Sequence, residues 1–80
     1  YYFYRTATGD ELDLVLEKGN QRIAIECKAS TAPKLAKGFW RAIEVVKPQQ
    51  TFVIIPTQVS YEIAPHVTVC GLSEFLNIEF

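Results

Sequence analysis

Three charged residues on two neighbouring segments have the types and spacing needed to bind a divalent cation. Asp13 lies in the alternating segment Glu11–Lys18, and Glu26 and Lys28 stand two positions apart at the end of the next alternating segment. One or two carboxylates suffice for Mg²⁺ or Mn²⁺, which keep several waters for a phosphate ligand. A nearby lysine stabilises the negative charge that develops when a phosphodiester is hydrolysed. We therefore expect a divalent-metal site of nuclease type around Asp13, Glu26 and Lys28.

The turn between the two segments predicts how these residues meet. Gly19–Asn20 has the composition of a two-residue hairpin turn, which makes Lys18 face Gln21 and sets the whole register. In that register Asp13 lies directly opposite Glu26, with Cβ atoms about 4.5–5.5 Å apart, where like charges destabilise a sheet. Most surface carboxylates belong to a solvated face without a special role. The direct opposition of two carboxylates favours a cation site over that interpretation.

The same register makes further predictions about both faces of the hairpin. It sets Glu11 against Lys28, Val15 against Ala24 and Glu17 against Arg22. A one-residue slip would turn the apolar face to solvent, so the register is well specified. We expect one buried apolar face behind the carboxylates, formed by Leu12, Leu14, Leu16, Ile23, Ile25 and Cys27.

The remaining segments predict a mixed sheet with helical cover. The aromatic run at the start has strand character, the β-branched run before Pro56 is typical of a strand covered on both faces, and the segment closing with Lys47-Pro48 has helical periodicity. The fold class is therefore α/β, with an antiparallel β-meander, a crossover helix and two further strands. The expected elements are strands over Tyr1–Thr6, Glu11–Lys18, Gln21–Lys28, Thr51–Ile55 and His66–Cys70, a helix over Pro33–Val46, a loop over Pro56–Pro65 and a helical turn over Gly71–Leu76 with Ser73 near its start.

Composition limits the class of protein. Eighty residues, half of them apolar, suffice for a single domain over residues 1–80, and the formal charge of −1 argues against a general nucleic-acid-coating protein. The two cysteines, Cys27 and Cys70, stand in apolar runs and predict buried thiols in a reducing cytoplasm. No segment has the roughly 20 apolar residues of a membrane helix. A glycine-rich phosphate loop is also missing, so we expect no ATP site in this segment.

Several other residues admit two interpretations. The single histidine, His66, follows Pro65 at a loop-to-strand junction, which favours a structural role over that of a general base. Trp40 beside Phe39 is typical of packing, although it could also stack on a base. The predicted helix carries a basic stripe that either meets DNA phosphates or is simply solvated. Its members are Lys34, Lys37, Arg41 and Lys47.

The motif around the carboxylates resembles a known superfamily. Glu11-Leu12-Asp13, followed after the hairpin by Ile25-Glu26-Cys27-Lys28, resembles the core of the PD-(D/E)XK nucleases. More closely, the chain is similar to the domain of unknown function at the C-terminus of many prokaryotic AAA-type ATPases. That likeness continues through Lys37-Gly38-Phe39, Phe52-Val53-Ile54 and the terminal Leu72–Leu76, so it covers nearly the whole chain.

The resemblance implies roles for individual residues. Asp13 and Glu26 would bind Mg²⁺ or Mn²⁺ together with the peptide carbonyl of Cys27, and Lys28 would be the lysine of the motif. Glu11 would complete the catalytic set, either as a carboxylate behind the ligands or as the ion-pair partner of Lys28. The implied fold is a restriction-endonuclease-like core that lacks its first helix. ATP would bind only in the missing part of the parent protein.

Two functions follow from this resemblance. The intact acid–acid–lysine set favours a Mg-dependent deoxyribonuclease appended to an AAA-type ATPase, with DNA as its substrate. The charge of −1 and the missing first helix favour a catalytically silent docking or regulatory module of that ATPase. A site that merely holds a structural cation is a third interpretation.

The first residues suggest a fragment that associates with itself. The chain begins without Met, directly in the aromatic run Tyr1–Tyr4, and we interpret it as part of a longer ATPase-type protein. Successive side chains of a strand point to opposite faces, so this run exposes an apolar patch at a strand edge. We therefore expect a homo-oligomer that uses this terminal strand.

Overall fold

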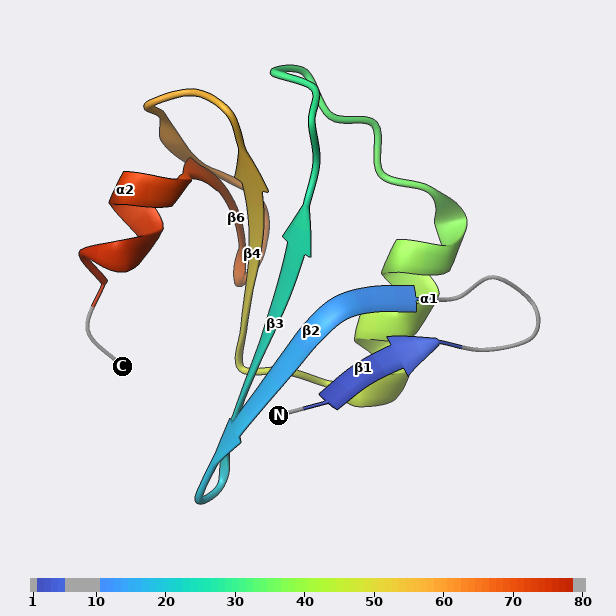
Figure 1. Ribbon diagram of the computed structural model, residues 1–80. Coiled ribbons are helices and arrows are strands. Elements are labelled where there is room, and N and C mark those ends of the chain that lie inside the picture. The colour runs from blue at the N-terminus through green and yellow to red at the C-terminus, as the bar shows by residue number, and fades with distance from the viewer. Residues whose placement is uncertain (1, 6–10, 79–80) are drawn as a thin grey trace.

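In the part of the chain that the structure describes, six strands form one mixed sheet (Figure 1). The computed structural model describes the backbone of residues 2–5 and 11–78 and the side chains of residues 12–78. The strand order across the sheet is β1-β2-β3-β4-β6-β5. The elements are β1 (Tyr2–Arg5), β2 (Glu11–Lys18), β3 (Gln21–Cys27), α1 (Lys37–Val46), β4 (Gln50–Ile55), β5 (Ser60–Ala64), β6 (Val67–Gly71) and α2 (Leu72–Leu76).

The strand directions follow from the lengths of the connections. β1, β2 and β3 are antiparallel neighbours, and the short turn between β2 and β3 permits nothing else. β4 runs parallel to β3 because α1 returns the chain to the starting end of the sheet, and β6 is parallel to β4. β5 pairs with β6 in antiparallel orientation at the edge. The predicted α/β class with a mixed sheet and a crossover helix is confirmed.

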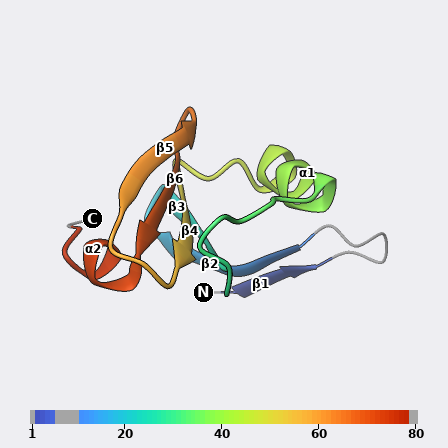
Figure 2. The same cartoon turned by 90° about the horizontal axis from the view of Figure 1, so that it is seen from above.

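The two helices cover opposite faces of the sheet (Figure 2). On the α1 face, Val53 and Ile55 of β4 join a core with Phe39, Ala42 and Val46 of the helix. On the α2 face, Phe52 packs with Ile23, Ile25 and Cys70, and its ring lies 5.2 Å from that of Phe75 in α2. The prediction that the strand Thr51–Ile55 is covered on both sides is therefore confirmed.

One predicted loop contains a strand. The segment Pro56–Pro65 was expected to be irregular, but Ser60–Ala64 forms the edge strand β5. A turn at Pro65 and His66, in which His66 has φ 64°, folds β5 back onto β6. β5 is short and most of its residues are exposed, so pairing with β6 rather than burial of one face stabilises this strand.

The helices begin later than expected, for local reasons. α1 starts at Lys37 rather than Pro33, and Ala36 at its N-cap provides no side-chain hydrogen bond. It ends at Val46 as predicted, where Lys47 adopts a left-handed conformation with φ 54° before Pro48. α2 starts at Leu72 directly after Gly71.

Gly71 occupies a position where a side chain has no room. A Cβ there would lie 2.1 Å from the backbone oxygen of Thr57 and 2.4 Å from Oε1 of Glu74. Glycine is therefore required by close approach of the backbone rather than by its own φ of −78°.

The terminal strand β1 forms one edge of the sheet beside β2. The predicted oligomer depends on the side chains of Tyr1–Tyr4, which lie outside the described residues. Among the helices that the structure describes, none is long and apolar enough to cross a membrane.

Candidate functional site

The β2–β3 hairpin has the predicted register over most of its length. Gly19 begins the turn with φ 60°, whereas Asn20 has a negative φ, the pattern of a type II′ turn. The ladder runs from Lys18 opposite Gln21 back to Leu14 opposite Ile25, and it includes Val15 opposite Ala24 and Glu17 opposite Arg22. The predicted pairs beyond Leu14 and Ile25 do not continue this ladder.

A β-bulge ends the regular pairing. Tyr2 faces Val15 but Tyr4 faces Leu12, so Phe3 alone is matched by the two residues Asp13 and Leu14 of β2. An extra residue in one strand changes the direction of the side chains that precede it.

The bulge corrects the predicted buried face. Leu12 is 1% exposed and joins Val15 and Ala24 in the core under α1, not Leu14 and Leu16 on the α2 side. The prediction of a buried apolar face behind the carboxylates was therefore wrong at Leu12, and Leu14 and Leu16 on that face are only partly buried. The run Leu14-Val15-Leu16 is apolar on both faces, which indicates that both faces of β2 are covered but not where the register shifts.

The two carboxylates meet through the backbone rather than as a facing pair. The Asp13 N–H donates to Oε1 of Glu26 over 3.1 Å, and the Cys27 N–H donates to Oδ2 of Asp13 over 2.8 Å. Lys28 donates its N–H to the Ile54 oxygen of β4, so the N–H of the preceding residue points the other way, toward β2. Where the bulge removes the backbone partner on β2, the side chain of Asp13 replaces it.

Glu26 is the buried member of the pair. Ala24, two positions earlier, belongs to the α1 core, so alternation places Glu26 on that same face. It is 4% exposed, and its Oε2 lies 3.4 Å from Nζ of Lys28. Burial and then the charge of Asp13 raise the pKa of the Glu26 carboxyl, opposed by the Asp13 N–H and by Lys28. The site therefore holds a carboxylate whose ionisation is costly unless a further positive charge is supplied.

The exposure of Cys27 differs from the prediction. The side chain was expected to be buried with the apolar face, but the residue is exposed, because β3 leaves its ladder with β2 here. Partial burial, followed by the charges of Asp13 and Glu26, raises the pKa of the thiol, which keeps it protonated at neutral pH. The other cysteine, Cys70, is buried as predicted. The side chain of Glu11 lies outside the described residues, so its predicted pairing with Lys28 stays a prediction.

The donor set at this site fits a hard cation with few protein ligands. Asp13 is exposed and contributes one oxygen, Oδ1, that accepts no hydrogen bond from the described residues. Among the described residues, only Lys28 holds Glu26 Oε2, in an ion pair that a cation would replace. Within residues 12–78, no three acidic, histidine or cysteine side chains form a common metal-binding group. Mg²⁺ would therefore be held by two carboxylates and complete its shell with water or phosphate oxygen.

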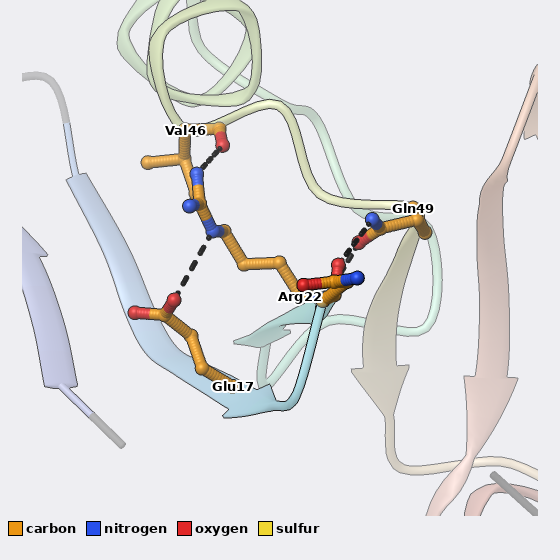
Figure 3. Close-up of polar contacts among 5 residues, drawn as sticks. Glu17, Arg22, Val46 and Gln49 are labelled. Carbon is orange, nitrogen blue, oxygen red and sulfur yellow. Dashed lines mark hydrogen bonds and ion pairs between the residues drawn. The ribbon is translucent and has the colours of Figure 1, made fainter.

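The turn end of the hairpin carries a different polar network (Figure 3). The guanidinium of Arg22 donates from Nη1 to the Val46 oxygen at the end of α1 over 2.5 Å, and its Nε lies 3.5 Å from Oε2 of Glu17. Gln49 Oε1 accepts from the Arg22 N–H, and Gln49 Nε2 donates to the Asn20 oxygen over 2.8 Å. The sequence predicted the pairing of Glu17 with Arg22, but not the contacts with α1 and Gln49.

His66 and Trp40 each admitted two interpretations, and they lie away from the carboxylates or in the core. His66 is exposed at the start of β6, where its carbonyl accepts from the Thr51 N–H, whereas Glu26 pairs with Val53 further along β4. This position agrees with a structural histidine. Trp40 packs edge-to-face on Phe39, with ring centroids 5.0 Å apart, which confirms the packing interpretation.

Comparison with known proteins places the chain in a family. Residues 1–75 match the model of a domain of unknown function, DUF4143. No curated protein and no solved structure matches the chain. The match spans both strands of the candidate site, the crossover helix and nearly all of α2. The chain therefore belongs to the DUF4143 family of domains of unknown function.

Proposed function

We propose that this domain hydrolyses phosphodiester bonds of DNA with the help of Mg²⁺ or Mn²⁺, as in the PD-(D/E)XK nucleases that its motif resembles. The observation that carries the proposal is the buried Glu26 carboxylate, held between the backbone of Asp13 and the ammonium of Lys28. Burial and the charge of Asp13 both oppose ionisation of Glu26 despite the ammonium of Lys28, so a bound cation would stabilise the pair of carboxylates.

The residues of the chain have distinct tasks in this proposal. Asp13 and Glu26 hold the cation, which when bound polarises the phosphoryl group and lowers the pKa of a bound water. The side chain of Lys28 is about one-third exposed and reaches Glu26 from the solvent side. Its ammonium can therefore contact a substrate oxygen while it stays near the carboxylate. Water adds to phosphorus and one P–O ester bond breaks, which leaves one phosphate end and one hydroxyl end.

A silent docking or regulatory module is the second candidate. This candidate is favoured because both carboxylate oxygens of Glu26 and one of Asp13 already have protein partners. In this alternative, the polar contacts of the carboxylates and Lys28 only hold β2 and β3 together. The two candidates differ in whether a divalent cation binds and whether a phosphodiester is cleaved.

A cleavage assay with matched variants separates them. The purified chain is incubated with end-labelled DNA in Mg²⁺ or Mn²⁺, and Glu26→Gln and Lys28→Ala are compared with Lys18→Ala at the turn end. Removing one group that stabilises developing charge lowers rates by about 10²–10³-fold. We expect that loss in both site variants and none in Lys18→Ala.

Two results would refute the nuclease. The first is a wild-type chain that cleaves no DNA while calorimetry detects no cation binding. The second is cleavage that persists unchanged in Glu26→Gln, which would identify a contaminating activity. Cation binding without cleavage would support a site that only holds a cation.

A further inference from the structure

The charges of this domain are segregated along the chain. Residues 28–47, from the site lysine to the end of the crossover, contain five of the eight Lys and Arg residues and a single acid, Glu44. Residues 48–80 contain three glutamates and neither Lys nor Arg. Residues 1–27 contain five acids and three Lys or Arg residues, so the basic segment lies between two segments of net negative charge.

The fold turns this segregation into a basic face. The basic segment comprises the loop after β3 and the helix α1, which covers one face of the sheet (Figure 2). Its residues Lys34 and Lys37 are exposed, as is Arg41, one helical turn beyond Lys37. Residues 48–80 form β4 inside the sheet, then β6, the edge strand β5 and the helix α2 on the opposite face, and their acids within the described residues are Glu62 and Glu74.

The buried carboxylate of the candidate site lies on the same face of the sheet as the basic residues. Glu26 points to the α1 face, and the loop that carries Lys34 starts directly after Lys28 and runs to α1 (Figure 1). The first turn of α1 has no acidic residue and no side-chain cap, so no side chain of that turn compensates the positive end of its dipole. Lys37 is the first residue of that turn and adds its charge at the same place.

We infer that Lys34 and Lys37 bind the sugar–phosphate backbone of a nucleic acid that flanks the bond placed at Glu26 and Lys28. This inference rests on the proposed function for the location of the scissile bond, but the binding surface itself does not require catalysis. Lysines on this surface neutralise phosphates without reading bases, so binding is insensitive to sequence and strongly dependent on salt.

Binding in the absence of metal tests this surface. Fluorescence anisotropy with labelled duplex DNA, and with single-stranded RNA of the same length, is measured in EDTA over a series of salt concentrations. The variant is Lys34→Gln with Lys37→Gln. The matched control, Lys18→Gln with Lys47→Gln, removes the same charge at the turn end of the hairpin and the far end of α1. Circular dichroism and melting verify that both double variants are folded.

We expect the site-side variant to bind at least about tenfold more weakly than the control in low salt. The magnitude of its slope of log K against log salt on duplex DNA should fall by about 2, since each lost phosphate contact removes about 0.9. Comparison of the DNA and RNA arms identifies which nucleic acid the surface prefers.

The outcomes separate this inference from the proposed function. Salt-dependent binding that needs Lys34 and Lys37, in a chain that cleaves nothing, would keep the surface and refute the nuclease. Cleavage with equal binding by both double variants would keep the nuclease and overturn the surface. No binding of either nucleic acid by the wild type would also overturn it.

Discussion

At the turn end of the β2–β3 hairpin, Glu17 and Arg22 face each other with opposite charges, and the guanidinium continues to the Val46 oxygen of α1. At the open end, Asp13 and Glu26 bring two carboxylates together, and the more buried one acquires a raised pKa. Both ends belong to the same pair of strands. The turn end uses charge to join the hairpin to a helix, whereas the open end places like charges where they cost stability.

This difference indicates where the hairpin serves stability and where it serves chemistry. At the turn end the cation of Arg22 lies beside Glu17 alone, whereas Glu26 lies beside the carboxylate of Asp13 as well as the ammonium of Lys28. The open end instead has a bulge that opens the ladder and an exposed Asp13. β-Bulges often occur beside functional sites, where they redirect a side chain.

Loss of Arg22 should have the largest effect. Arg22→Ala removes a charged hydrogen bond to the last turn of α1, worth about 1.5–3 kcal/mol, and a half-exposed ion pair worth less than about 1 kcal/mol. We expect the free energy of unfolding to fall by about 2 kcal/mol, measured by urea denaturation. Arg22→Lys is the control: it keeps the charge near Glu17 but loses the planar fork, so it should recover little. A loss below about 0.5 kcal/mol would show that the turn end does not stabilise the domain.

Substitution of the turn glycine should cost less. Gly19 has φ 60° and its missing Cβ would meet nothing within 4 Å, so Gly19→Ala introduces backbone strain without a clash. We expect a destabilisation of about 1 kcal/mol by urea denaturation. Asn20→Ala, in the same turn but at negative φ, should change stability by less than about 0.5 kcal/mol. Equal costs for the two variants would contradict the turn assignment.

Removal of the charge on Asp13 should be neutral or stabilising without metal. Asp13→Asn keeps an oxygen that accepts from the Cys27 N–H and removes the repulsion with Glu26, a gain of up to about 1 kcal/mol. With Mn²⁺ at about 10 mM, the wild type should melt at a higher temperature and the variant should gain less. A wild-type melting curve that does not respond to Mn²⁺ would count against a cation site at the open end.

The raised pKa of Glu26 predicts a pH dependence with a definite sign. The folded state holds a proton on Glu26 more tightly than the unfolded chain, whose carboxyl titrates near 4.5. The stability from this group is therefore fully present below pH 4.5 and is lost as pH rises through the higher folded pKa. We expect the urea midpoint of the wild type, relative to Glu26→Gln, to decrease from pH 4.5 upward until the carboxyl is ionised. A difference that stays constant or increases over that range would mean that folding does not raise the pKa of Glu26.

The sequence alone determined the α/β class, the register of the hairpin near its turn and the proximity of Asp13, Glu26 and Lys28. Period-two alternation on both sides of Gly19–Asn20 sufficed for this, because a two-residue turn allows only one pairing that buries an apolar face. The β-branched run ending at Ile55 similarly predicted a strand covered on both faces.

Only the tertiary structure decided how the site is built. The bulge at Asp13 depends on how β1 pairs with β2, and the sequence has no local signal for that register shift. Whether Glu26 is buried depends on α1, which folds over the face that Ala24 and Val15 share with it. The contact of Arg22 with Val46 joins residues 24 positions apart. Local patterns specify alternation and turns, but burial and bulges arise from elements that meet only after the chain has folded, because packing and ladder partners are shared among distant segments.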